Sequence, residues 1–427
     1  MKKDIYKLCE TLWPINRSIT GEGVRKTLEI IKKIIPNLVI KEIPSGTKCF
    51  DWTVPYEWSI KDAYIIDPDG KKIVDFKENN LHVLGYSTPV NKLINLSKLE
   101  KHLYSLPDLP NAIPYVTSYY KKRWGFCIQD NVRKKLKKGL YRVLIDSSHK
   151  QGSLTYGELI IPGEIKSEIF LSTYVCHPSM ANNELSGPAV TTYLAKWINT
   201  IKTRYSYRII FIPETIGSIC YLQKNLLQMQ QNIIAGFNIT CVGDDNCFSF
   251  VPSRIEDSIA DRAAKHVLRF LHPDYVSYSF LDRGSDERQY CSPGVDLPVV
   301  SIMRSKYREY IEYHTSLDNL DFISPEGLFG SFEAIQKAIL CLENNCFPVA
   351  KQLCEPFLSK RNLRSSIGGE KTLRKDIALM MDLLIYSDGN RDLISIAEKI
   401  NCPLWELIDV LEKLKKENLI ELHEHKD

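Results

Sequence analysis

The sequence lacks three features that would narrow its class at once: a long apolar run, a cysteine framework and a large net charge. Its apolar stretches are too short to cross a bilayer, which excludes a protein built from membrane-spanning helices. Its twelve cysteines include no Cys-x-x-Cys pair, so we expect reduced core thiols rather than disulfide staples. A net charge of +4, against 56 basic and 52 acidic residues, gives no reason to expect a polyanionic partner.

The N-terminal segment also lacks an apolar stretch of the kind that directs secretion. Residues 1–10 include acidic and polar side chains before any such stretch can form. We therefore expect a soluble, cytoplasmic protein with no membrane partner. Its 427 residues leave room for two or three domains, each with a core of its own.

The pattern of apolar residues predicts an α/β domain that is interrupted by a smaller β-rich domain. Between residues 121 and 348, β-rich runs alternate with helix-like segments, which is typical of a sheet covered by helices on both faces. Residues 46–120 instead contain short β-rich runs joined by turns. The main domain is therefore expected to comprise residues 1–45 and 121–348, with residues 46–120 nested within it.

The nested region is rich in aromatic side chains: Phe50, Trp52, Tyr56, Trp58 and Tyr64. Such residues can form a binding face, but in a small domain they more often fill the core. We expect core packing here.

Residues 349–427 predict a linker followed by a winged helix, with helices over 373–386, 394–400 and 404–416 and a strand over 419–422. From residue 371 onward there are nine basic and twelve acidic residues. DNA recognition by such a domain requires basic groups that face phosphate. The charge argues against DNA, and we expect the winged helix to serve packing or homo-oligomerisation.

Two histidines and a glutamate stand out in the α/β domain. His177 follows the β-rich run 168–173, Glu214 follows the run 208–212, and His314 lies in a Tyr-His-Thr-Ser segment after a later strand. In α/β sheets, ligands bind at the carboxyl ends of strands. A hydrolytic zinc site needs protein ligands, an open position for water and a nearby carboxylate. These residues predict two zinc ligands and a general base, although packed histidines and a helix-capping glutamate are the alternatives.

A loop at residues 282–290 is dense in charge and precedes a predicted strand. Asp286 can hold a substrate amine there, while Arg283 or Arg288 can hold a carboxylate or phosphate. A solvated surface turn is the alternative interpretation.

The order of these segments resembles the zinc aminopeptidases with two co-catalytic metals, to which glutaminyl cyclases are related. The matching segments are His177, 182–187, 214–218, 285–286 and 313–315. The whole chain is more similar to a bacterial family of aminopeptidase-like proteins, associated with polysaccharide biosynthesis, that carry a nested small domain and a C-terminal winged helix. The segments that support this closer match are 16–21, 51–55, 57–58, 80–82, 113–120, 124–127 and 176–179.

The resemblance implies a zinc-exopeptidase-like fold, but three positions depart from the aminopeptidase pattern. Asn183, Thr215 and Thr240 stand where such enzymes carry metal-binding carboxylates. Two dications a few ångströms apart repel each other unless carboxylates lie between them. We therefore expect one zinc ion rather than two.

The resemblance makes His177 and His314 ligands of this zinc, with Glu184 or Glu214 as the third ligand. If Glu184 binds the metal, Glu214 remains free to act as the general base. We predict that the ligands are His177, Glu184 and His314.

The predicted function is metal-dependent hydrolysis of an amide bond in a small-molecule or peptide-like substrate. Glu214 and Asp286 are the expected catalytic residues: Glu214 deprotonates water, and Asp286 or a nearby arginine orients the substrate. The expected substrate contacts are Asn183, Arg283, Arg288 and Tyr313. The first alternative function is a non-catalytic scaffold that retains the pocket for binding and uses the winged helix for assembly. The second alternative is a DNA-binding regulator.

Overall fold

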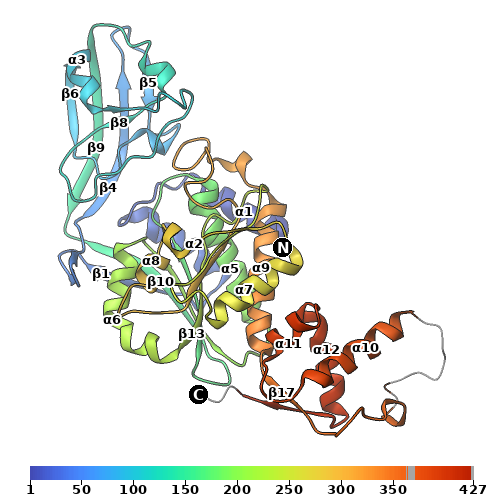
Figure 1. Ribbon diagram of the computed structural model, residues 1–427. Helices are drawn as coiled ribbons and strands as arrows, with labels where there is room; N and C mark the ends of the chain where they lie inside the picture. Colours follow the sequence, from blue (N-terminus) through green and yellow to red (C-terminus); the bar gives the residue numbers. More distant parts are fainter. Residues whose placement is uncertain (362, 364–370, 425–427) are drawn as a thin grey trace. The chain divides into compact units, whose positions relative to one another are not determined.

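The computed structural model describes residues 1–361, 363 and 371–424 (Figure 1). The chain divides into two compact units. Unit 1 comprises Met1–Glu256 and Val276–Phe332, and unit 2 comprises Asp257–Tyr275 and Glu333–Asp427. Among the described residues, every helix is too short or too polar to span a bilayer.

An eight-stranded mixed sheet forms the centre of unit 1, in the order β1-β10-β12-β11-β13-β16-β14-β15. The strands are β1 (Val39–Pro44), β10 (Ser153–Ile161), β11 (Glu168–Tyr174), β12 (Ser206–Ile212), β13 (Ile233–Asn238), β14 (Ser249–Val251), β15 (Val276–Ser277) and β16 (Val299–Met303). The strands β12, β11, β13 and β16 run parallel, so their carboxyl ends meet at one edge. His177 and Glu214 follow β11 and β12 at this edge, as predicted.

Helices cover both faces of this sheet. Every residue of β11 is buried, and because alternate side chains of a strand point to opposite faces, both faces must be packed. The helices of unit 1 are α1 (Lys2–Leu12), α2 (Glu22–Ile34), α3 (Leu96–Leu99), α4 (Asp130–Arg133), α5 (Ser186–Ile198), α6 (Ile216–Asn232) and α8 (Glu287–Tyr290). The predicted α/β fold class is therefore confirmed.

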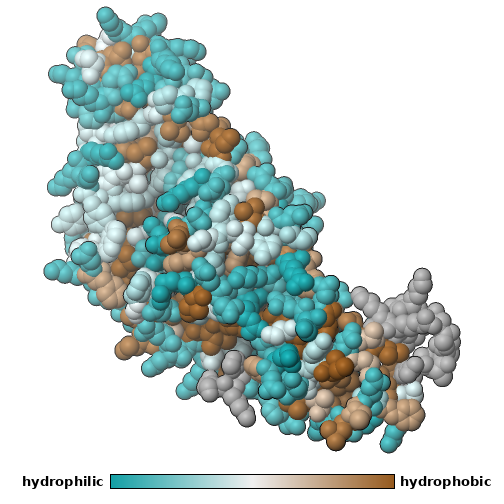
Figure 2. Space-filling view, in the orientation of Figure 1, coloured by the Kyte–Doolittle hydropathy of each residue, from teal (hydrophilic) through white to brown (hydrophobic). Residues whose placement is uncertain are grey.

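A second sheet of four antiparallel strands has the order β5-β4-β9-β6 and lies at the top of Figure 1. Its strands are β4 (Glu57–Ile66), β5 (Lys72–Asp75), β6 (Val90–Asn95) and β9 (Leu140–Lys150). The sheet therefore extends past the boundary expected at residue 120, because β9 pairs with both β4 and β6. Figure 2 shows that the surface over this sheet is mostly hydrophilic, with apolar residues scattered across it.

A short hairpin of β2 (Lys48–Cys49) and β3 (Trp52–Thr53) precedes the second sheet, and β7 (Leu103–Tyr104) pairs with β8 (Phe126–Cys127). A disulfide joins Cys49 of the hairpin to Cys220 of α6, with Cα atoms 5.0 Å apart. The expectation that all cysteines are reduced was therefore wrong. The two partners are 171 positions apart in the sequence, so no local spacing predicts the pairing.

Unit 2 contains the predicted winged helix. Its helices are α7 (Ile259–Leu271), α10 (Lys371–Tyr386), α11 (Leu393–Lys399) and α12 (Leu404–Lys416), and α9 (Pro325–Asn344) runs into it from unit 1. The strands β17 (Phe347–Ala350) and β18 (Ile420–His423) pair antiparallel. Two contacts join elements of this unit. Arg262 forms a two-pronged, partly buried ion pair with Asp392. Nε2 of the buried His266 accepts a hydrogen bond from the backbone N–H of Leu404.

Candidate active site

His177 is held in place by a buried ion pair. Glu184 lies on a single turn of π-helix (Ala181–Leu185) that leads into α5. One oxygen of Glu184 accepts a hydrogen bond from the backbone N–H of His177 at 3.0 Å. The same oxygen lies 3.1 Å from Nδ1 of the His177 ring. The other oxygen accepts from Nε of Arg17 at 3.0 Å, and both side chains are at most 1% exposed. Both oxygens of Glu184 are thus occupied by groups of the protein itself.

The other nitrogen of His177, Nε2, faces Glu214. The two groups are 3.6 Å apart, between Nε2 and Oε2, and the Glu214 side chain is 22% exposed. Burial raises the pKa of Glu214, and the nearby His177 opposes that rise. The His177 ring is therefore oriented by Glu184 at one nitrogen and presents the other to the open side of the site.

His314 lies beside this pair in a strained backbone conformation. Its φ of +57° is in the left-handed region, which is uncommon for a residue other than glycine and is often found at functional sites. The ring of Tyr115 contacts both histidines, at centroid distances of 5.3 Å to His177 and 5.1 Å to His314. The two histidine rings are 5.6 Å apart.

The imidazole of His314 has a nitrogen that is not used by the protein. Its Nε2 is buried and has no hydrogen-bond partner among the described residues. Burial and the nearby His177 lower the pKa of His314 to about 3, so the ring is neutral at physiological pH. Tyr313 stacks on the His314 ring at 3.9 Å, which places this predicted substrate contact at the site.

Asp286 lies next to Glu214 and is completely buried. Its Oδ1 accepts hydrogen bonds of 2.8 Å from the backbone N–H of Thr215 and from the hydroxyl of Ser218, both at the start of α6. Its Oδ2 has no partner in the described part of the chain. Burial, and then repulsion by Glu214, raise the pKa of Asp286 to about 7, so this carboxyl can gain or lose a proton near neutral pH.

The two arginines of the charged loop differ in position. Arg288 donates to the hydroxyl of Thr215 at 3.0 Å and to the carbonyl of Ser285 at 2.8 Å, which places it at the site. The guanidinium of Arg283 lies 5.0 Å from the centroid of the Phe280 ring and donates to the backbone carbonyl of Phe280 at 3.4 Å. The structure therefore does not bring Arg283 to the histidines.

Two of the three positions that lack carboxylates, Asn183 and Thr240, form a neutral hydrogen-bond network around Tyr174. The amide nitrogen of Asn183 donates to the Tyr174 hydroxyl at 2.8 Å, and the Thr240 hydroxyl donates to it at 2.5 Å. The Tyr174 hydroxyl in turn donates to the backbone carbonyl of Asn183. Neutral groups therefore occupy the places where a second metal would need anionic ligands.

The donor types of the site match those of a metal centre, but the ligand atoms of His177, His314 and Glu214 are not gathered within 4.8 Å of one another in the structure. His177 and His314 supply two imidazoles of the kind that bind catalytic zinc, and Glu214 lies 3.6 Å from Nε2 of His177, where it can act as a further ligand or as a base. Glu184 was expected as a ligand with His314, but its position at Nδ1 of His177 suits an orienting role instead.

A compact cluster of ligand-type atoms also lies on the Glu184 side of His177. The sulfur of Cys176, Nδ1 of His177 and an oxygen of Glu184 lie within 4.8 Å of one another. Burial raises the pKa of the Cys176 thiol well above its usual range, so the sulfur stays protonated and is a poor ligand. This cluster is better explained as the packing that supports His177.

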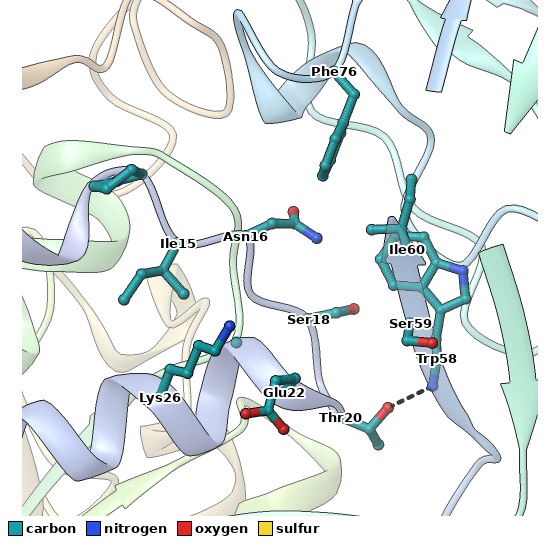
Figure 3. Close-up of a pocket in the computed structure, with 12 residues that line it drawn as sticks. Ile15, Asn16, Ser18, Thr20, Glu22, Lys26, Trp58, Ser59, Ile60 and Phe76 are labelled. Atoms are coloured by element: carbon teal, nitrogen blue, oxygen red, sulfur yellow. Dashed lines mark hydrogen bonds between the residues drawn. The ribbon is translucent and has the colours of Figure 1, made fainter. Parts of the chain in front are cut away.

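The loop that carries Arg17 borders a separate hollow of about 380 Å³ (Figure 3). Figure 3 shows Asn16 and Ser18 of this loop on one side and Ile60 and Phe76 on the other. The backbone N–H of Trp58 in β4 donates to the Thr20 hydroxyl at 3.1 Å, which ties the loop to the second sheet. Neither histidine lines this hollow, so its walls support the Arg17 loop rather than the candidate metal centre.

The fold defines the class of protein: a zinc-aminopeptidase-like α/β domain. The zinc aminopeptidase BSAP from Bacillus subtilis superposes with a TM-score of 0.57 at 13% identity, over 80% of this chain and 94% of that one. Residues 346–422 match the model of a winged helix-turn-helix. These findings confirm the expected fold and the expected C-terminal domain.

Residues 6–345 match the family model described as a domain of unknown function, DUF4910, and the chain belongs to that family. A Clostridium acetobutylicum protein, provisionally described as a polysaccharide biosynthesis protein with an aminopeptidase-like domain, is 48% identical over 397 residues, which are 93% of this chain and 91% of the relative. A crystal structure from Clostridium acetobutylicum, provisionally described as a peptidase, has a TM-score of 0.92 and 45% identity over 99% of this chain and 96% of that one. The predicted resemblance is confirmed.

Arg17 and Tyr115 contact the histidines but were not among the residues predicted for the site. Both lie in segments that matched the bacterial family, 16–21 and 113–120, but no residue pattern within those segments points to a contact with a histidine more than 60 positions away.

Proposed function

We propose that this protein is a hydrolase of amide bonds that uses a single zinc ion. The observation that supports this most directly is the group of His177, His314, Glu214 and Asp286, in which the buried atoms Nε2 of His314 and Oδ2 of Asp286 have no partner among the described residues. Leaving such buried polar atoms unpaired is costly, and functional sites are where proteins accept this cost.

Each residue has a distinct part in the proposed reaction. A zinc ion on the two histidines would polarise the substrate carbonyl and make bound water more acidic. Glu214 takes the proton of the attacking water. Asp286, whose pKa is about 7, changes the net charge next to Glu214 when it gains or loses a proton. Glu184 orients His177 by holding Nδ1, which leaves Nε2 free for the metal.

The substrate of this proposal is an N-acylated sugar or a related amino-sugar conjugate. Arg288 and Tyr313 lie where they can contact it. The link to polysaccharide biosynthesis comes from the description of the Clostridium acetobutylicum relative.

Replacing Glu214 by Gln tests this function. Hydrolysis of a panel of aminoacyl 4-nitroanilides and N-acetylated amino sugars is measured together with zinc content. Loss of a proton-transferring group lowers the rate by ~10²–10⁴-fold. Retained zinc with lost turnover identifies Glu214 as the base, and loss of both identifies it as a ligand.

The matched control is Glu164→Gln, because Glu164 forms an exposed ion pair with Lys202 and should not affect turnover. A Glu214→Gln variant that turns over as fast as the wild type contradicts the proposal.

A binding scaffold is the second candidate, and the network around Tyr174 is the observation that favours it. Neutral side chains at Asn183 and Thr240 are what a metallopeptidase site would contain after losing its two-metal chemistry. A scaffold predicts no hydrolysis of any compound in the panel by the wild type, and no functional change in Glu214→Gln.

A further inference from the structure

A second cavity of unit 1, of about 400 Å³, is lined largely by aromatic and basic side chains. We call it the aromatic groove and define it by Tyr56, Tyr86, Tyr119, Tyr120, Lys121 and Lys122. Its volume falls within the ~300–1,000 Å³ range of ligand pockets.

The rings at the rim of the groove are exposed, contrary to the expectation of core packing. Tyr56 is 58% exposed, Tyr120 is 54% exposed, and the neighbouring Trp52 is 39% exposed. The rings of Trp52 and Tyr120 meet edge to face at 6.0 Å, and the Tyr120 hydroxyl donates to the carbonyl of Thr53 at 3.0 Å. These contacts already hold the rings of Trp52 and Tyr120 in place. The two side chains therefore lose little conformational entropy when a ligand stacks on them.

The expectation of core packing holds for Trp58, which is buried and stacks on Tyr86 at 5.6 Å. Tyr86 forms the base of the groove, since it is 2% exposed and its hydroxyl is bonded to Thr20. The aromatic residues of the nested region therefore divide into a packed base and an exposed rim.

The charge of the groove is positive. Lys121 and Lys122 are exposed, and no ion pair of either is formed within the described residues. The lining residues include no Asp or Glu. His149, Gln151 and Ser118 add polar groups. The groove thus offers ring faces, hydrogen-bonding groups and two unpaired cations to one ligand.

The groove shares a wall with the candidate active site. The hydroxyls of Tyr119 and Tyr115 are hydrogen bonded at 2.7 Å, and the Tyr115 ring contacts both His177 and His314. The hairpin that carries Trp52 is joined by the disulfide to α6, the helix that begins two residues after Glu214. The Tyr119–Tyr115 pair therefore links the wall of the groove to the two histidines through direct side-chain contacts.

We infer that the aromatic groove binds an acidic sugar unit of an oligosaccharide substrate. The exposed rings match the apolar C–H faces of a pyranose, the polar groups match its hydroxyls, and the two lysines match a carboxylate. As a statement about substrate, this inference rests on the proposed function. Binding itself does not depend on hydrolysis.

Isothermal titration calorimetry of the full chain tests the inference. The probes are short oligomers of galacturonate, glucuronate and N-acetylneuraminate, with neutral glucose and N-acetylglucosamine oligomers for comparison. We expect at least one acidic oligomer to bind in preference to the neutral ones. Tyr120→Ala and Lys121→Ala/Lys122→Ala should each weaken binding about tenfold or more, a loss of ~1.4 kcal/mol.

Matched controls change equally exposed residues elsewhere in unit 1. Leu93→Ala removes an exposed apolar side chain, and Lys98→Ala/Lys101→Ala removes two exposed lysines, so neither should change binding. The inference is overturned if no acidic oligomer binds, if neutral oligomers bind equally well, or if groove variants bind like the controls. Preferential binding of a triglutamate peptide would overturn the sugar assignment.

Glu214→Gln separates this inference from the proposed function. Sugar binding that persists in this variant, with no turnover of the panel by the wild type, supports the groove and contradicts the hydrolase. Turnover without any sugar binding contradicts the groove and supports the hydrolase.

Discussion

At the scale of single residues, the central feature is the buried chain of contacts from Arg17 through Glu184 to His177. Arg17 also donates to the carbonyls of His177 and Leu12, so this cation supports both the backbone and the ring of the histidine. A histidine whose Nδ1 is held by a carboxylate has a defined ring orientation, and this arrangement is common behind metal ligands. Arg17, 160 positions earlier in the chain, thereby helps to fix the ring of His177 and the direction of its Nε2, the nitrogen that we propose binds zinc.

Arg17→Met should lower the free energy of unfolding of unit 1 by ~3–5 kcal/mol, because it leaves the buried Glu184 carboxylate without its cation. Urea unfolding followed by tryptophan fluorescence measures this change. Lys202→Met is the control, since its exposed pair with Glu164 should be worth less than ~1 kcal/mol. The double variant Arg17→Met/Glu184→Gln should be less destabilised than Arg17→Met. An Arg17→Met variant as stable as the control would show that the pair does not support the site.

The residues that sequence could locate are those at strand ends. His177 and Glu214 were placed correctly because the carboxyl ends of parallel strands meet at one edge. The role of Glu184 was not predictable, because seven residues of separation do not tell which nitrogen of His177 the carboxylate will reach. Arg283 and Arg288 could not be distinguished either, since both lie in one charged loop and only packing turns one of them toward Phe280.

At the scale of elements, unit 2 depends on a buried histidine that caps a helix. Nε2 of His266 in α7 accepts a hydrogen bond of 2.9 Å from the backbone N–H of Leu404, the first residue of α12. Burial and the nearby Arg269 lower the pKa of His266 to about 4. The capping bond requires the neutral ring, since a protonated nitrogen cannot accept.

The stability of unit 2 should therefore fall on acidification. The unfolded chain binds a proton at His266 near pH 6.5, whereas the folded chain resists it down to about pH 4, so the free energy of unfolding decreases between these values. The loss is ~3 kcal/mol, and above pH 6.5 this residue contributes no pH dependence. Calorimetry of the wild type and of His266→Gln from pH 7.5 to 4.5 measures the difference. The exposed His423 provides the control variant His423→Gln. Parallel pH curves for the wild type and His266→Gln would refute this role.

The elements themselves were largely predictable, but their partners were not. The apolar periodicity placed α11 and α12 within a residue or so of their bounds, because each buries one apolar face. The strand β9 was predicted as a strand but assigned to the main domain, since its sequence carries no information on which sheet it joins. The exposed rim of the aromatic groove was missed because composition alone does not separate packed rings from presented ones.

At the scale of the whole molecule, the chain combines an aminopeptidase-like unit with a winged-helix unit. The winged-helix region carries more acidic than basic residues. We therefore still expect it to serve homo-oligomerisation or packing rather than DNA binding, and we still expect a cytoplasmic protein. A cytoplasmic location would keep most thiols reduced. The Cys49–Cys220 disulfide, which closes a long loop, runs against this expectation.

The central claim is that unit 1 holds one zinc ion between His177 and His314. Elemental mass spectrometry of protein purified without chelator tests it most directly, in the wild type, in His177→Ala/His314→Ala and in the control His423→Ala. The account predicts about one zinc per chain in the wild type and in the control, and none in the double variant. A wild-type protein without metal, even after zinc is added back, would contradict the account and favour the binding scaffold.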